Sequence, residues 1–125
     1  MKRALIVLLA LAAACSSDSG TALHPGALTL RLAAGGSSDG AVVLTVSGGP
    51  VTSVDAPAGV QVASNADGRG THIMVIGNLA AGAIATINVP DVARASAYVA
   101  TIEQVSDRGT FALIDAARYQ VTIGP

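Results

Sequence analysis

A serine between two glycines is the first feature of the sequence that could do chemistry. Gly36-Ser37-Ser38-Asp39-Gly40 fits the pattern G-x-S-x-G, in which a sharp strand-to-helix turn exposes a serine whose proton a histidine takes. The residues from Ala41 onward alternate as a strand and not as a helix, and nothing in the sequence places His24 or His72 beside Ser38. We therefore expect a polar loop here, and a small envelope hydrolase using Ser38 is an alternative hypothesis.

A second segment could supply oxygen ligands to a calcium ion. Asn65, Asp67 and Gly68 are spaced like half of a calcium-binding loop, in which glycine permits the turn that wraps the ion. Ala63 stands where the first ligand belongs, and no glutamate closes the loop. Asp-Gly is also a common turn pair, because Gly accepts positive φ and Asp can bond its own backbone. A turn is the prediction, with a calcium-stabilised adhesion module as another alternative.

The two histidines and the carboxylates are spread singly along the chain. His24 precedes Pro25 and His72 falls near the start of a predicted strand, so neither metal-ligand spacing nor a shared helix face arises, and we expect ordinary surface or edge histidines. Glu103 alone falls in a strand, facing outward. A hydrolase with a carboxylate pair is a further alternative, but no catalytic residue, metal site or cofactor is predicted. The other acidic residues fall mostly at turns, where Asp is favoured: Asp39, Asp55, Asp67, Asp91, Asp107 and Asp115.

The N-terminal segment has the layout of a secretory signal peptide. Met1-Lys2-Arg3 gives a positive start, Ala4 to Ala14 form an uncharged apolar run, and small residues precede Cys15. The run is too short to cross a bilayer as a helix, which takes about 20 residues. Two other interpretations stay open: an ordinary signal peptide cut after Ala12 or Ala14 with Cys15 as a stray thiol, and an uncleaved short anchor.

The residues Leu11-Ala12-Ala13-Ala14-Cys15 resemble the lipobox of bacterial lipoproteins. The resemblance covers only the first 15 residues and departs from the commonest form in having Ala12 where Leu is most frequent. It implies transfer of diacylglycerol to the Cys15 sulfur, cleavage after Ala14 and acylation of the new amino group, so Cys15 is the one predicted site residue. By resemblance to enterobacterial sorting rules, Ser16 in place of an aspartate implies the outer membrane.

A lipidated cysteine would fix the protein to the bacterial cell envelope. Each buried methylene contributes roughly 0.8 kcal/mol, and two or three acyl chains hold a protein stably where one does not. The small polar residues that follow, Ser16 to Thr21, are typical of a flexible tether. We predict a signal peptide over residues 1–14, a lipid-anchored tether over 15–26 and one domain over 27–125.

The composition argues against a nucleic acid as the partner and against a typical carbohydrate-binding module. No lysine follows Lys2, and the remaining arginines are scattered singly, so no basic stripe exists to bind a nucleic acid. With no Trp, two Tyr and one Phe, the chain lacks the aromatic platforms that stack on bases or sugars. A single cysteine forms no internal disulfide, so aliphatic burial must stabilise the fold.

From Ala27 onward, runs of aliphatic residues alternate with clusters of Gly, Pro, Asn and Asp, as in an all-β protein. Leucines alternate with polar residues over 28–32, and Val and Leu alternate over 41–47, so each segment places one face in the core. Together with the glycine-rich loop between them, these two segments predict a first hairpin.

One predicted strand is apolar on both faces. Ile73-Met74-Val75-Ile76 has the composition of a central strand that is covered on both sides. Farther along, Tyr98 and Tyr119 each head an apolar alternation, and we expect their rings to pack in the core with the hydroxyl satisfied. A corner hydrogen bond of the kind found in sandwich domains is the alternative for one of them.

About eight or nine short strands predict an all-β fold: a single antiparallel β-sandwich of immunoglobulin-like or cohesin-like type, with an up-and-down barrel as the alternative. Gly40–Val46 and Gly77–Pro90 resemble cohesin-type sandwich domains of bacterial envelope proteins over part of the mature chain. That resemblance implies non-catalytic recognition of a partner through a sheet face, although none of the binding residues of that family can be matched here.

These observations predict a non-enzymatic lipoprotein of the bacterial envelope. Its β-sandwich would bind or scaffold an envelope protein or a glycan, while lipid on Cys15 holds it at the membrane.

Overall fold

Nine strands and two short 3-10 helices make up the part of the chain that the computed structural model describes, which is residues 22–33, 39–79 and 81–125. The strands are β1 (Gly26–Ala33), β2 (Asp39–Ser47), β3 (Ser53–Asp55), β4 (Val60–Asp67), β5 (Gly70–Leu79), β6 (Gly82–Val89), β7 (Val99–Asp107), β8 (Leu113–Ile114) and β9 (Gln120–Gly124). The helices are η1 (Val92–Ala97) and η2 (Ala116–Arg118).

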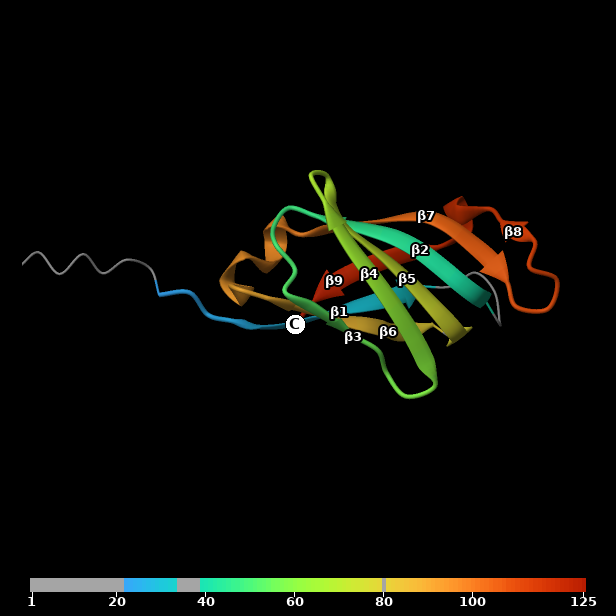
Figure 1. Ribbon diagram of the computed structural model, residues 1–125, viewed down its shortest axis with the longest axis horizontal. Coiled ribbons are helices and arrows are strands. Elements are labelled where there is room, and N and C mark those ends of the chain that lie inside the picture. The colour runs from blue at the N-terminus through green and yellow to red at the C-terminus, as the bar shows by residue number, and fades with distance from the viewer. Residues whose placement is uncertain (1–21, 34–38, 80) are drawn as a thin grey trace, which may run out of the picture.

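The strands form two sheets that pack face to face (Figure 1). One sheet has the order β3-β6-β1-β9, the other has the order β4-β5-β2-β7-β8, and all neighbours are antiparallel. The predicted all-β antiparallel sandwich is thereby confirmed. No strand pairing joins the two sheets among the described residues, so a sandwich and not a closed barrel forms.

The core lies between the inner faces of the sheets and consists mainly of aliphatic side chains. Every second residue of β1 is buried, beginning at Leu28, and the same is true of β2 from Val42 to Val46. These alternations match the period of two that a strand with one covered face requires. Two tyrosines, Tyr98 and Tyr119, are buried with this aliphatic core.

The predicted first hairpin is wrong. β1 pairs with β6 and β9, whereas β2 pairs with β5 and β7, so the two strands belong to different sheets. An alternation shows that one face of a strand is buried, but strands stacked across the core have the same alternation as strands joined side by side.

The prediction that the 73–76 segment is covered on both faces is also wrong. Ile73 and Val75 are fully buried, but Met74 and Ile76 on the opposite face are 42% and 43% exposed. β5 is central in its sheet, between β4 and β2, yet no element among the described residues lies over its outer face.

The backbone of His24, just before β1, is hydrogen-bonded to the N-terminal end of η1. The His24 backbone N–H donates to Asp91 Oδ1 at 3.3 Å, and the Val92 N–H donates to the His24 carbonyl at 2.8 Å. Asp91 also caps η1 by accepting from the Ala93 N–H at 3.1 Å. At the other end of η1, the Tyr98 hydroxyl donates to the Pro50 carbonyl at 2.7 Å, so this buried ring has its hydroxyl satisfied, as the sequence predicts, by a residue 48 positions away.

Candidate functional site

Two of the predicted residues lie outside the described part of the chain. They are Cys15, the predicted lipidation site, and Ser38, the serine of the G-x-S-x-G pattern. Asn65 and Asp67 lie on the outer face of β4, where Asp67 ends the strand at the turn into β5. The predicted turn at Asp67 is confirmed.

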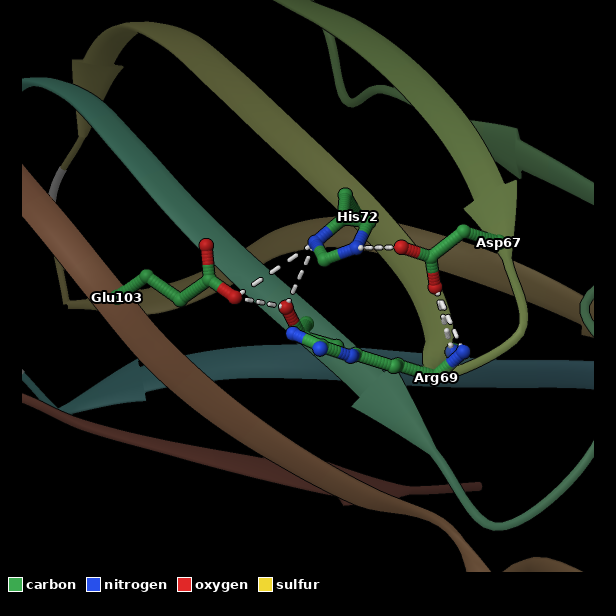
Figure 2. Close-up of polar contacts among 6 residues, drawn as sticks. Asp67, Arg69, His72 and Glu103 are labelled. Carbon is green, nitrogen blue, oxygen red and sulfur yellow. Dashed lines mark hydrogen bonds and ion pairs between the residues drawn. The ribbon is translucent and has the colours of Figure 1, made fainter.

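His72 lies at the surface, as predicted, but it makes more polar contacts than an isolated surface histidine would. It lies on β5, with strands on both sides, and its ring is held between polar side chains from β4 and β2 (Figure 2). His72 Nε2 lies 2.9 Å from Asp67 Oδ2, and Nδ1 lies 2.9 Å from Thr45 Oγ1. The Thr45 hydroxyl also donates to Glu103 Oε1, an oxygen that is 3.6 Å from His72 Nδ1.

Strand register brings these four residues together. His72 lies opposite Asn65 of β4 on one side and opposite Thr45 of β2 on the other. The pairing of β2 with β7 shifts between Val43 and Leu44, which leaves Glu103 as an extra residue in β7. A bulge of this kind re-aims a side chain, and here the Glu103 carboxylate reaches Thr45. We call Thr45, Asp67, His72 and Glu103 the His72 network.

The hydrogen-bond partners of His72 favour the doubly protonated form of its ring. When the single proton of the Thr45 hydroxyl goes to Glu103, Thr45 can only accept from His72, which requires a proton on Nδ1. The carboxylate of Asp67 accepts from Nε2–H. The doubly protonated ring satisfies both contacts at once, and it lies between the carboxylates of Asp67 and Glu103.

The pKa values of His72 and Asp67 shift in agreement with this arrangement. The hydrogen bond to Asp67 is the largest cause that raises the His72 pKa above its usual 6.5, and the charges of Asp67 and Glu103 add to it, against partial desolvation and the Arg69 charge. The backbone N–H of Arg69 is the largest cause that lowers the Asp67 pKa, followed by the hydrogen bond to His72.

Asp67 fixes the turn and the imidazole at the same time. Its Oδ1 accepts from the backbone N–H groups of Arg69 at 2.7 Å and Gly70 at 3.2 Å, while its Oδ2 faces His72. The tight turn before β5 thus orients the Asp67 carboxylate, and this carboxylate then positions the His72 ring.

The His72 network does not have the chemistry of a hydrolytic triad. A general base must accept the proton of the nucleophile, but the Thr45 hydroxyl donates to Glu103 and not to His72. The two carboxylates face opposite ring nitrogens, so they do not converge on one ion. The network instead links β4, β5, β2 and β7 electrostatically.

Over residues 22–33, 39–79 and 81–125, no group of three or more His, Cys, Asp or Glu residues could hold a metal ion. Both oxygens of Asp67 are committed to the turn and the histidine. Asp55 accepts from Asn88, Asp107 caps the turn after β7, and Asp115 caps η2. Asp67, Asp107 and Asp115 therefore act as local capping groups, as Asp at a turn is expected to do, whereas Asp55 bonds across two paired strands.

Beside the network, apolar side chains gather on the outer face of the five-stranded sheet. A hollow of about 230 Å³ is lined by Val43, Met74 and His72, together with residues of β4. A second hollow of about 390 Å³ is lined by Ile76 and Phe111, and Phe111 is 81% exposed. We call Val43, Met74, Ile76 and Phe111 the outer stripe.

Neither the His72 network nor the outer stripe was predicted as a site from the sequence. The network depends on cross-strand register, which the sequence does not specify. The stripe did leave a signal, because Met74 and Ile76 give β5 its apolar outer face.

No helix in the described segments is long and apolar enough to span a membrane. No protein family, curated protein or solved structure matches this chain. The functional assignment below therefore rests on the residues and their geometry.

Proposed function

We propose that this chain is a lipid-anchored lipoprotein of the bacterial envelope whose β-sandwich is a non-enzymatic binding module. Lipid on Cys15 holds it at the membrane, and the outer face of the five-stranded sheet contacts an envelope partner. Recognition through a sheet face is also the mode that the cohesin resemblance implies.

One observation carries the proposal of a binding face. Met74 and Ile76 lie on a central strand and are more than two-fifths exposed. The outward face of an antiparallel sheet is normally polar when water covers it, and contiguous exposed apolar side chains mark interaction sites. The opposite sheet provides the contrast, because its outer face presents Thr29, Thr86 and Asn88.

The chemistry of the site supports binding more than catalysis. The His72 network holds its protons in closed hydrogen bonds and leaves no activated nucleophile. Its half-exposed carboxylates add polar specificity beside the apolar outer stripe, which is the composition of a contact surface with an apolar centre and a polar rim.

Site-specific photo-crosslinking in the native envelope tests the binding face. A photoreactive residue at Met74 of the full chain should give a discrete adduct, and the same residue at Thr86, on the outer face of the other sheet, should not. Equal labelling from both positions, or none from position 74, would contradict the proposal.

Lipidation has its own test. Cys15→Ser should abolish incorporation of a fatty-acid analogue and either release the protein or block its processing. Cys15→Ala should behave in the same way, whereas Ser16→Ala should retain the label. Labelling that persists in Cys15→Ser would end this part of the proposal.

A further inference from the structure

We propose that β4 pairs antiparallel with β4 of a second copy of this chain, so that two five-stranded sheets join into one continuous sheet. This inference goes beyond the binding face and does not depend on it, because it concerns the margin of the sheet and not its surface.

The four sheet margins in the described structure differ in how well they are protected. β3 has three residues and β8 has two, so both are too short to template another strand. β9 lies against β7 at the flank of the sandwich. β4 forms the remaining margin with eight residues, and in Figure 1 it lies along the edge of the larger sheet.

β4 also lacks the devices that keep an edge strand from pairing. Natural edges carry charges, prolines or bulges. Val60 to Ala66 contains no charge, no proline and no glycine, and β4 pairs with β5 without a register shift. All residues from Ala63 to Asp67 are exposed, and β5 is the only described strand that pairs with β4, so the backbone N–H and C=O groups on the other side of β4 have no strand partner.

The sequence of β4 is self-complementary in one antiparallel register. With Ala63 opposite Ala63 of the second copy, Gln61 lies opposite Asn65, and the two carboxamides can exchange hydrogen bonds. On the inner face, Val62 lies opposite Ser64. Asp67 lies opposite Gly59, so the two Asp67 carboxylates stay apart.

A second copy is favoured over a different strand because this register satisfies both partners with the same residues. The pairing has two-fold symmetry and uses up both edges, so it closes as a dimer and does not propagate as a fibre. It also places the outer stripes of the two copies on the same side of one sheet.

Crosslinking in the native envelope tests the register. In the full chain, Ala63→Cys should give a dimer with a short bis-maleimide, because directly opposed residues have Cβ atoms about 4.5–5.5 Å apart. Gln61→Cys should give little, since the two copies of residue 61 are offset by about 13 Å along the strands. Gln61→Cys combined with Asn65→Cys should restore the dimer.

Absence of a dimer from Ala63→Cys would overturn the proposal, and so would equal yields from Ala63→Cys and Gln61→Cys, which indicate random collision. The unsubstituted chain gives the background from Cys15.

Charge variants provide a second readout that needs no crosslinker. Gln61→Glu with Asn65→Glu sets carboxylate against carboxylate, so the protein mass in mild detergent should fall to that of one chain. Gln61→Lys with Asn65→Glu sets opposite charges against each other and should restore twice that mass. If both variants have the same mass, whether that of one chain or of two, pairing through β4 is contradicted.

Discussion

At the scale of single residues, His72 is defined by the protons it holds. Its two ring nitrogens face polar groups of different strands, so the ring is oriented and its charged form is favoured. A neutral imidazole has only one N–H and would have to give up one of these contacts. Deprotonation of His72 is therefore linked to the pairing of the strands around it.

The first prediction concerns the dependence of stability on pH. The folded pKa of His72 is raised, so its stabilising contribution is fully present below the usual value of about 6.5 and is lost as the pH rises through the folded pKa. Urea unfolding at a series of pH values should show the free energy of unfolding falling over that window. His72→Gln should remove this step.

His24→Gln is the matched control, because the His24 side chain belongs to no polar contact described around Asp67. It should leave the step in place. A pH profile that is the same for the unsubstituted chain and for His72→Gln would show that the network does not stabilise the fold. On the acid side, the lowered pKa of Asp67 predicts a contribution that is present above about pH 3.8 and lost as the pH falls through its folded pKa.

The second prediction concerns Tyr98. Tyr98→Phe removes the hydrogen bond to the Pro50 carbonyl while keeping the ring, and one such bond contributes about 0.5–1.5 kcal/mol. The free energy of unfolding should fall by that amount in a urea titration. Tyr98→Leu should lower it further because the ring is lost as well, and a Tyr98→Phe chain as stable as the original would contradict this account.

Residue roles that depend on near neighbours in the chain could be predicted from the sequence. Asp67 was predicted to lie at a turn, and its contacts with Arg69 and Gly70 span only two and three positions. The His72 network could not be predicted, because Thr45 and Glu103 are 58 positions apart and meet through a register that includes a bulge.

At the scale of elements, the turn after β2 depends on the backbone of a glycine. Gly48 has φ of +100°, and a Cβ there would lie 1.8 Å from the Ala97 carbonyl oxygen. Gly59 also has a positive φ, of +80°, but a Cβ there would meet nothing within 4 Å. An alanine at position 59 would therefore test backbone strain alone, whereas one at position 48 would add steric overlap.

The third prediction uses this pair. Gly59→Ala carries only the strain of a left-handed residue, about 1–2 kcal/mol. Gly48→Ala adds a collision with backbone, so its loss of unfolding free energy should exceed that of Gly59→Ala by at least about 1–3 kcal/mol. Thermal or urea unfolding checks this, and equal losses would mean that the β2–β3 connection moves to accommodate the methyl group.

The buried faces of the strands were predicted better than the pairing between strands. The period of two identified the inner faces of β1 and β2, because burial on one side leaves that pattern directly in the sequence. Pairing was not encoded in this way, so the hairpin of β1 with β2 was predicted wrongly. The outer face of β5 was predicted wrongly for a different reason. An apolar face that is exposed in the single chain cannot be told by its residue types from one that is buried.

At the scale of the whole molecule, two isoleucines distinguish the core from the proposed contact surface. Ile87 is fully buried between the sheets, and Ile76 is 43% exposed on the outer stripe. The same substitution at the two positions therefore separates folding from association.

The fourth prediction follows. Ile87→Ala should lower the free energy of unfolding by about 2–5 kcal/mol, because it leaves a cavity in the core. Ile76→Ala should cost less than about 1.5 kcal/mol in the purified chain but should reduce photo-crosslinking from position 74. If both variants unfold equally easily, Ile76 is a core residue and the outer stripe is not a contact surface.

The position of β1 has a mechanical consequence. β1 lies between β6 and β9 and is antiparallel to both, and His24 just before it is held by Asp91 and Val92. Tension on residues 22–25 would first load the His24 contacts and then pull β1 along its own axis. The hydrogen bonds to both neighbours run across the strands, so they would resist the load together in shear and would not peel apart one at a time. A domain tethered through this strand is built to resist pulling on its N-terminal segment.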